Sequence, residues 1–375
     1  MRVCMTNLFS RGKKEHTLFK DERVLYPEFV PEQLLHRERQ LEEFAFAFKP
    51  LTQGGRPENV FVFGPTGTGK TVSMRLVLRD LEGFSDRVKS KYLNCFEFNS
   101  RQSVLTELAA FLGVPVPRRG VGVAEAYAQF LEGLKRASFV PVVVLDEFDQ
   151  LFFREGNALL YDLLRTSEQT KKFVGVVLIS NDAHLPLRFE DRVRSSFSRL
   201  SVAFDAYTPM QLKDILRERS EKAFVGHGVG EEVIPLIAGH AARKGGDCRI
   251  AIEALLKAGR IAERANASSI QVPHARQAFA AMESPLKKSM ERLSDSERVV
   301  LQCILDWKGE SISSGQLYEL LQTAKGLGER RTREVLAKLE SLKLVTLTWK
   351  ELEGRGRTRV IALALPRNVV MKELA

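Results

Sequence analysis

Short apolar runs and amphipathic stretches alternate along the chain up to about residue 206. Five runs are rich in Val, Ile, Leu and Phe, and three of them are nearly continuous, as in strands buried on both faces of a parallel sheet. Segments with helical spacing lie between them, so the pattern predicts an α/β fold with a doubly wound parallel sheet. The predicted strands are NVFVFG (59–64), KYLNCFEF (91–98), VPVVVLDEF (140–148), FVGVVLISN (173–181) and LSVAFDA (200–206).

The pattern changes on both sides of this sheet. Residues 1–21 are polar and predict a flexible tail, which leaves 22–206 as the core domain, with a first helix expected from about Pro31. Residues 207–285 show only helical periodicity and predict a helical lid. Residues 286–375 read as three helices and two strands joined by a Gly/Arg-rich turn, which is the order of a winged-helix domain.

Composition narrows the class of protein. The chain is 44% hydrophobic and 28% charged, and it has no apolar run long enough to span a membrane and no secretory signal at the N-terminus. The four cysteines are far apart, which favours reduced thiols over disulfides or a zinc site. We therefore expect a cytoplasmic, nucleoid-associated protein without a membrane partner.

The charge is strongly basic and unevenly distributed. The net charge is +10, and residues 286–375 hold 17 basic and 12 acidic residues, a net of +5. Half of the excess thus lies in the last quarter of the chain. A basic domain favours an anionic partner, most often nucleic acid.

The segment GPTGTGKT (64–71) matches the P-loop pattern G-x-x-x-x-G-K-[ST] and lies between a predicted strand and a predicted helix. Gly64, Gly67 and Gly69 let backbone N–H groups surround a phosphate without Cβ clashes. Lys70 supplies a positive charge for the β- and γ-phosphates, and the hydroxyl of Thr71 is a ligand for Mg²⁺. The segment predicts a nucleoside triphosphate site.

The segment VVVLDEFDQL (142–151) completes this site. Its strand ends in Asp146, which can bind Mg²⁺, and in Glu147, which can act as a general base toward water. Asp149 fits better as an acidic residue in the first turn of a helix. The distance along the chain from Lys70 leads us to expect that the two motif-bearing strands are neighbours in the sheet.

Three further polar residues are placed to act on the γ-phosphate. Asn181 ends an apolar strand and can orient a water molecule. Arg192 lies just past that strand and can reach a neighbouring subunit's nucleotide as an arginine finger, although Arg194 is close enough to be confused with it. Arg249 follows a good N-cap, Asp247, and is directed from the helical domain toward the nucleotide.

The helix predicted over ERRTREVLAKLESL (329–342) has one apolar and one basic face. Arg330 and Arg333 lie on the outward face beside small residues, which lets a helix approach DNA closely. The turn between the last two strands carries Arg355 and Arg357 and resembles a wing that enters the minor groove. A solvated basic helix and a protein-docking winged helix remain the alternatives.

These motifs together resemble the AAA+ ATPases, and within them the archaeal origin-recognition initiators of the Orc/Cdc type. The resemblance runs from about residue 22 to residue 365. The HRE, RVRSSF and GD-x-R segments, in this order, are more specific than the Walker motifs. The matching segments are YPEFVPEQLLHRERQLEEF, GPTGTGKT, LDEFDQL, LISND, FEDRVRSSF, YTPMQLKDILRER, GGDCRIAIEALL and the C-terminal winged-helix pattern.

The resemblance implies that ATP or ADP binds with Mg²⁺, and it implies a role for individual residues. The helical insertion at about 101–136 would touch DNA, with Arg118 and Arg119 as phosphate contacts. The nucleotide would contact Gly64, Pro65, Thr66, Gly67, Thr68, Gly69, Lys70, Thr71 and Val72, with Tyr207 and Arg219 where the core meets the lid. The catalytic set would be Lys70, Asp146, Glu147, Asn181 (sensor 1), Arg192 (finger) and Arg249 (sensor 2), with Thr71 and Asp146 on the metal.

The function implied is that of an ATP-dependent replication initiator. It would bind duplex origin DNA beside other initiator protomers and recruit or load the replicative helicase (MCM), with slow ATP hydrolysis as a switch. Two alternatives remain open: a branch-migration type of AAA+ DNA motor, and a DNA-binding regulator that holds ADP permanently. The change Lys70→Ala would abolish motor activity while leaving simple DNA binding largely intact.

Overall fold

The computed structural model describes residues 17–374 apart from 116, 118–120, 198, 227, 283–289, 291–292, 308 and 352–356, and apart from the side chains of 324, 325, 350, 351, 357, 372 and 373. The chain forms two compact units, Met1–Ala278 and Phe279–Ala375. Of the DNA contacts predicted from the sequence, Arg118, Arg119 and Arg355 lie outside the described residues, as does the side chain of Arg357.

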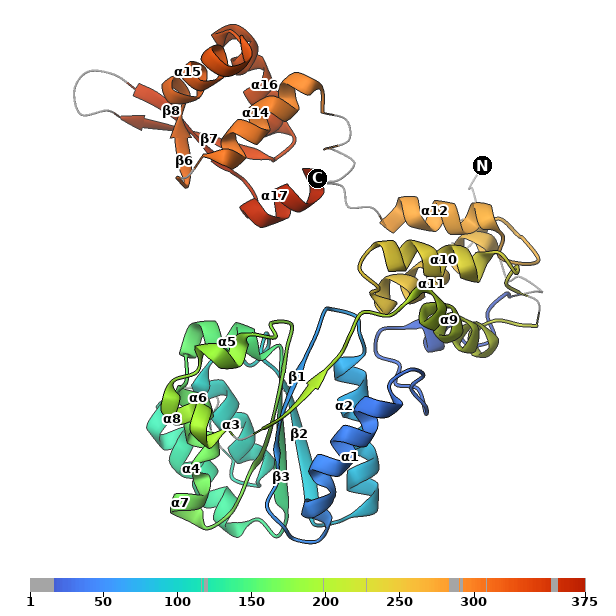
Figure 1. Cartoon of the computed structure of the whole chain (residues 1–375), viewed down its shortest axis with the longest axis vertical. Helices are drawn as coiled ribbons and strands as arrows, with labels where there is room; N and C mark the ends of the chain where they lie inside the picture. The colour runs from blue at the N-terminus through green and yellow to red at the C-terminus, as the bar shows by residue number, and fades with distance from the viewer. Residues whose placement is uncertain are drawn as a thin grey trace, which may run out of the picture. The chain divides into compact units, whose positions relative to one another are not determined.

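A five-stranded parallel sheet forms the centre of the first unit (Figure 1). The order β2-β3-β4-β1-β5 confirms the doubly wound α/β class. The expectation that the strands before Lys70 and Asp146 are neighbours is wrong, because β4 lies between β1 and β3. The strands are β1 (Asn59–Phe63), β2 (Val88–Asn94), β3 (Val140–Asp146), β4 (Gly175–Ser180) and β5 (Arg199–Ala203).

Alternate residues of these strands enter two separate cores. Val60 and Val62 face a core formed with α1 and α2, whereas Phe61 faces a second core formed with helices on the opposite side of the sheet (Figure 1). Burial on both faces explains the near-continuous apolar runs. The helices of this domain are α1 (Glu38–Thr52), α2 (Lys70–Phe84), α3 (Arg101–Phe111), α4 (Val123–Arg136), α5 (Phe148–Glu155), α6 (Ala158–Leu164), α7 (Thr166–Thr170) and α8 (Asp191–Ser196).

Helix α1 begins later than the sequence predicted. The apolar spacing indicated a helix from about Pro31, but the first helical residue is Glu38. His36 has a φ of 61°, in the left-handed region, which a right-handed helix cannot include. The chain therefore turns at His36, and this turn directs Arg37 into the protein, where it is buried.

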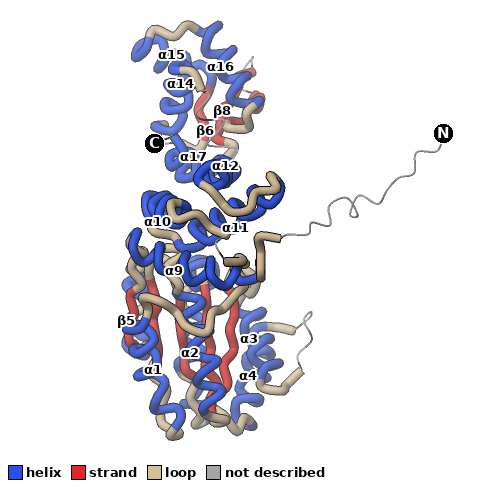
Figure 2. The backbone as a smooth tube through the Cα atoms, turned by 90° about the vertical axis from the view of Figure 1, so that its right-hand side faces the viewer, coloured by secondary structure: helices blue, strands red, loops and turns tan. Residues whose placement is uncertain are grey.

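The lid is an all-helical domain in the same unit as the sheet (Figure 2). Two 3-10 helices lie outside the lid in sequence, η1 (Glu22–Leu25) and η2 (Leu185–Arg188). Of these, η1 contacts the lid helices α9 and α11. Each helix described in the protein is too short or too polar for a membrane-spanning segment. The lid helices are α9 (Pro209–Ala223), α10 (Val233–Arg243), α11 (Cys248–Arg264) and α12 (Val272–Met282).

The segment that precedes the sheet packs on the lid. The ring of Phe19 lies 4.7 Å from that of Phe224, and the backbone N–H of Leu18 donates to Glu263 at 2.9 Å. Arg260 of α11 pairs with Glu22 at 2.5 Å. The structure thus differs from the predicted tail at residues 17–21, which are held against the lid.

The second unit combines helices with a small antiparallel sheet of order β6-β8-β7. Its apolar side chains form one core, to which Val335, Leu336 and Leu339 of α16 contribute. The sequence missed β6 and α17, which are short. The elements are α14 (Asp295–Asp306), β6 (Ser311–Ser313), α15 (Ser314–Lys325), α16 (Glu329–Ser341), β7 (Val345–Glu351), β8 (Arg357–Leu363) and α17 (Arg367–Leu374), which is the order typical of a winged helix.

The buried carboxylate of Glu297, on α14, forms a contact with α16. We expect Glu297→Gln to lower the free energy of unfolding of this unit more at neutral pH than at acidic pH. Lys338 donates to Glu297 at 2.8 Å, and the N–H of Ser294 donates to it at 2.9 Å. Burial alone would raise the pKa of Glu297, but these hydrogen bonds outweigh it and hold the pKa below the ordinary value of 4.5. The carboxylate therefore contributes stability above pH 4.5, and this contribution is lost as the pH falls through the folded-state pKa.

Both tryptophans of the chain, Trp307 and Trp349, belong to this unit, so intrinsic fluorescence reports its unfolding. We expect Glu297→Gln to lower the free energy of unfolding by about 1 kcal/mol near neutral pH. The difference from wild type should shrink toward acidic pH. Glu340→Gln, on the exposed side of α16, is the matched control. An effect of Glu297→Gln that does not change with pH would contradict this assignment.

Candidate nucleotide-binding site

The P-loop connects β1 to α2 and is shaped by three glycines with positive φ. Gly67 has a φ of 70°, which disfavours any other residue, and a Cβ there would lie 1.6 Å from Oδ1 of Asp247 in the lid, so that side chain would have to move. The N–H of Cys248 also donates to the carbonyl of Gly67 at 3.1 Å. The loop is therefore in direct contact with the start of α11, and a side chain at residue 67 would push the lid away.

Lys70 is the first residue of α2 and its side chain lies under the loop. Its ammonium group donates to the carbonyls of Gly64 at 2.7 Å and Pro65 at 2.8 Å, and to Oδ1 of Asn181 at 2.9 Å. Lys70 is 7% exposed. Burial lowers its pKa, and the nearby charges of Glu147 and Asp146 partly offset this. The arrangement holds a cation at the start of a helix, where anions bind.

Asp146 ends β3 and lies against Thr71. The Thr71 hydroxyl donates to Oδ2 of Asp146 at 2.8 Å, and the hydroxyl of Tyr92 on β2 donates to the same oxygen. Tyr92 was not found by sequence reasoning, because an aromatic residue inside an apolar strand carries no motif signal. Thr71 and Asp146 together offer the hard oxygen ligands that Mg²⁺ uses beside phosphate.

Asn181 bridges the two motifs because β4 lies between β1 and β3. Its Oδ1 accepts from Lys70, and its Nδ2 donates to Oε2 of Glu147 at 2.8 Å. Glu147 itself has a φ of 54°. A residue other than glycine in this region is strained, and such strain concentrates at functional sites. The strand order thus brings an amide, an ammonium group and a carboxylate into one chain of hydrogen bonds.

The acidic side of the site is desolvated. Burial raises the pKa of Asp146, and it raises that of Glu147 with further contributions from Asp146 and Asp149. Asp149 is buried in the first turn of α5 and accepts a hydrogen bond from Ser180 at 2.9 Å. Clustered, partly dehydrated carboxylates favour a bound cation, so these residues fit Mg²⁺.

Arg249 lies in the first turn of α11, as the sequence predicted, but its guanidinium is paired with Asp247. The two contacts to the carboxylate measure 3.1 and 3.3 Å. The hydrogen bond to Asp247 raises the pKa of Arg249, and the charge of Glu147 acts in the same direction. Arg249 is thus close enough to the site to interact with it electrostatically while remaining 64% exposed.

Tyr207 and Arg219 lie where the core meets the lid. Tyr207 is buried with its hydroxyl beside Gly69, and burial raises its pKa to about 12. Arg219 is also buried, and it donates to the carbonyl of Val24 at 2.9 Å over the ring of Phe29. Arg219 therefore contacts the N-terminal segment, and its contact with nucleotide stays a prediction.

The side-chain contacts described for Arg192 are with Glu190 and Tyr161 and not with the P-loop. It lies on α8, 63% exposed, paired with Glu190 at 2.7 Å and placed over the ring of Tyr161. A hollow of about 360 Å³ opens beside it, with the ion pair of Arg101 and Asp162 in its wall. An exposed arginine outside its own site is compatible with action on a second subunit.

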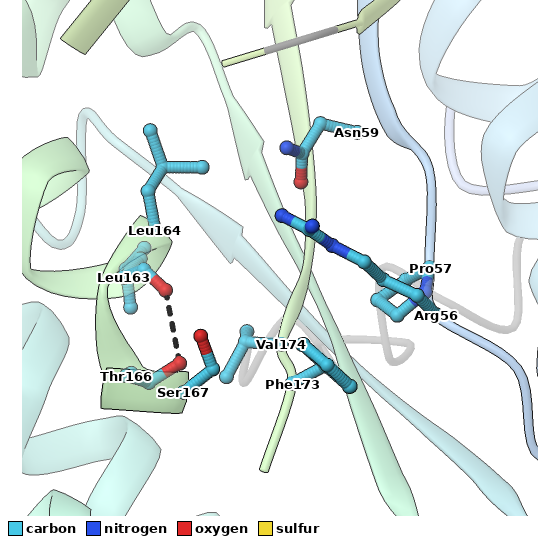
Figure 3. Close-up of a pocket in the computed structure, with 9 residues that line it drawn as sticks. All are labelled: Arg56, Pro57, Asn59, Leu163, Leu164, Thr166, Ser167, Phe173 and Val174. Atoms are coloured by element: carbon cyan, nitrogen blue, oxygen red, sulfur yellow. Dashed lines mark hydrogen bonds between the residues drawn. The ribbon is translucent and has the colours of Figure 1, made fainter. Parts of the chain in front are cut away.

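A second hollow lies at the end of the sheet opposite the P-loop, where strands β1 and β4 begin (Figure 3). It measures about 10 Å³, which is room for about one water molecule. No nucleotide fits there. The residues around it are Arg56, Pro57, Asn59, Leu163, Leu164, Thr166, Ser167, Phe173 and Val174.

In the second unit, α16 presents its basic face to solvent. Arg330 is 96% exposed, 3.6 Å from Glu334, and Arg333 contacts Glu329 at 2.9 Å and lies 5.9 Å from the ring of Tyr318. These ion pairs are exposed and weak. Both arginines are free to exchange their carboxylate partners for phosphate.

Two protein-family models match the first unit. A model described as an AAA domain matches residues 54–188, and the Cdc6 AAA+ ATPase-type lid domain matches residues 213–280. The two matches cover the sheet domain from before β1 to η2 and most of the lid. An AAA domain supports nucleotide binding by this chain, and the P-loop around Lys70 is the predicted place for it.

Curated relatives and solved structures match nearly the whole chain. The "ORC1-type DNA replication protein 1" of Sulfurisphaera tokodaii is 31% identical over 370 residues, covering 96% of this chain and 93% of the relative. The "ORC1-type DNA replication protein" of Pyrococcus abyssi is 33% identical over 381 residues, covering 96% and 91%. The ORC1 protein of Aeropyrum pernix, solved in complex with DNA, is 34% identical with a TM-score of 0.69, covering 96% and 97%.

The resemblance found in the motifs is therefore confirmed along the length of the chain. These matches cover more than nine-tenths of this chain and of each relative. The chain belongs to the Orc/Cdc6 family of archaeal ORC1-type DNA replication proteins, within the AAA+ ATPases.

Proposed function

We propose that this protein is an ATP-dependent replication initiator that binds duplex DNA at origins, beside further initiator protomers, and recruits or loads the replicative helicase. The observation that carries the proposal is the match of the whole chain to the Aeropyrum pernix ORC1 protein, whose structure is a complex with DNA. A single family covering both units favours an initiator over a branch-migration motor or a permanently ADP-bound regulator.

The proposed nucleotide is ATP, bound with Mg²⁺ at Thr71 and Asp146. The metal would neutralise phosphate charge. Lys70 leaves the carbonyls of Gly64 and Pro65 for the phosphates, which frees Asn181 from one of its two partners. Asn181 then orients a water molecule, and Glu147 accepts its proton. Hydrolysis is slow in an isolated chain because Arg192 is remote and acts only on a neighbouring protomer.

The proposed switch is the angle between the sheet domain and the lid. Gly67 touches Asp247 directly, so phosphate that reshapes the loop also shifts the start of α11. Arg249 exchanges part of its pairing with Asp247 for the γ-phosphate. A ligand that binds one lid position more tightly moves the population toward that position. Hydrolysis then changes how the protein holds DNA or recruits its partner.

The proposed function is tested by footprinting the full chain on chromosomal duplex DNA at two salt concentrations. An initiator should protect discrete sites, and these should persist when salt is raised, because base contacts depend less on counterion release than phosphate contacts do. Featureless protection that disappears with salt would contradict origin recognition and favour a non-specific motor.

We expect Arg330→Ala and Arg333→Ala each to weaken DNA binding. Both side chains extend from the exposed face of α16, where the sequence predicts contact with phosphates or base edges. The expected loss is about tenfold for each variant, measured by fluorescence anisotropy with a labelled duplex. Arg276→Ala, exposed on α12, is the matched control. Wild-type affinity in the double variant would show that α16 does not carry the interface.

A further inference from the structure

Arg37 is a buried arginine that joins three separate segments around the P-loop. It is 4% exposed. Its guanidinium donates to the carbonyl of Thr68 in the P-loop at 2.9 Å, to that of Asp205 beyond β5 at 2.8 Å, and to that of His36 at 3.1 Å. Among the described residues it forms no ion pair. Burying a cation costs free energy, so these three hydrogen bonds are what hold it in place.

The same guanidinium stacks on the residue at the hinge between core and lid. Arg37 lies 3.9 Å from the ring centroid of Tyr207 and 5.3 Å from that of Phe204. Tyr207 is in contact with both sides of the site: a Cβ on Gly69 would lie 2.9 Å from its hydroxyl, and its N–H donates to the carbonyl of Gly246 at 3.4 Å. Arg37 thus fixes a ring that contacts both the P-loop at Gly69 and the segment just before α11 at Gly246.

The neighbouring residue reaches the lid itself. Nε2 of His36 lies 3.1 Å from Oδ2 of Asp214 on α9. The left-handed turn at His36 sends the two adjacent side chains to different domains. Two adjacent residues therefore contact different parts of the site: His36 contacts a lid helix, and Arg37 contacts the P-loop.

We propose that Arg37 is a positioning residue that transmits the state of the P-loop to the lid. The inference rests on the proposed function, in which nucleotide binds at the loop. Phosphate binding requires the loop amides to point at the ligand. Any adjustment at Thr68 moves a carbonyl that Arg37 holds, and the same fork holds Asp205 and the ring of Tyr207. The loop and the hinge then move together, and α9 follows through His36.

The test compares Arg37→Gln and Arg37→Lys with Arg39→Gln. Arg39 is an exposed neighbour on α1 that pairs only with Glu43 among the described residues, so its loss leaves the loop and hinge contacts intact. Hydrogen–deuterium exchange is followed at residues 64–72 and in α9, without nucleotide and with saturating ATP. Binding of a fluorescent ATP analogue is titrated in parallel.

In the wild type and in Arg39→Gln, ATP should slow exchange both in the loop and in α9. In Arg37→Gln, we expect about tenfold weaker binding and, at saturation, protection of the loop without protection of α9. Arg37→Lys should show the same separation to a smaller degree, because an ammonium group lacks the planar fork. If Arg37 had only a structural role, its substitution would change hydrogen–deuterium exchange by the same factor with and without ATP.

The outcomes separate the two proposals. A wild-type chain that binds no ATP would overturn the proposed function and this inference with it. A wild-type chain that binds ATP without protection of α9, or variants that protect α9 as the wild type does, would overturn the inference alone. If Arg37→Gln does not fold, Arg37→Lys, which keeps the charge and the length, decides the question.

Discussion

Lys70→Ala is expected to weaken ATP binding by about 100-fold, because a charged donor to phosphate contributes about 1.5–3 kcal/mol for each hydrogen bond lost. In the structure its ammonium group holds the carbonyls of Gly64 and Pro65 and the side chain of Asn181. Without the lysine, the phosphates lose their cation and Asn181 loses one partner. Titration with a fluorescent ATP analogue measures the effect.

The fold should survive this change, because the lost contacts are hydrogen bonds to the loop and to Asn181 and do not include the cores on either face of the sheet. Lys172→Ala is the matched control: Lys172 also donates to a backbone carbonyl, that of Ala137 at 3.1 Å, but it is exposed and precedes β4. DNA binding by Lys70→Ala should persist, since Lys70 is not among the residues predicted to contact DNA. ATP affinity unchanged in Lys70→Ala would place the nucleotide elsewhere.

Glu147→Gln is expected to slow hydrolysis by about two to four orders of magnitude, which is the usual contribution of a general base. The amide keeps the size of the side chain and can still accept from Nδ2 of Asn181 through its remaining oxygen. It cannot accept a proton from water. ATP binding should therefore remain close to that of the wild type, while single-turnover phosphate release becomes very slow.

The two quantities to compare in Glu147→Gln are its affinity for ATP and its rate of ATP hydrolysis. Glu58→Gln removes an exposed carboxylate just before β1, at the opposite edge of the sheet, and should leave both quantities unchanged. If Glu147→Gln hydrolysed ATP at the wild-type rate, the general base would have to be another group. If it lost binding as well, Glu147 would be supporting the loop and not the chemistry.

The sequence was most informative where function and local structure depend on neighbouring residues. The hydrophobic runs overlap all five strands, and they fit best at β1, β3 and β4, because strands buried on both faces need continuous apolar residues. The half-exposed β2 begins three residues before the predicted run 91–98 and ends four residues before the end of that run. The P-loop was recognised because glycine spacing, lysine and threonine act within eight residues, GPTGTGKT. The cap at Asp247, which begins α11, was predicted for the same reason.

Such local patterns do not reveal which strands are neighbours or which distant residues come into contact. The expected neighbours β1 and β3 are separated by β4, and only that order explains why Asn181 contacts both Lys70 and Glu147. Tyr92 and Arg37 escaped notice because their roles depend on partners far away in sequence. A tyrosine in a strand and an arginine before a helix are ordinary residues until the tertiary contacts are known.

The central claim is that nucleotide bound at the first unit governs how the protein holds DNA. The most direct measurement is the affinity of Glu147→Gln for an origin duplex with ATP, compared with its affinity with ADP. We expect the two affinities to differ by about tenfold, a coupling of the size usual for linked sites, and we expect Lys70→Ala to abolish the difference. Equal affinities with ATP and ADP, and the same footprint in both states, would contradict it.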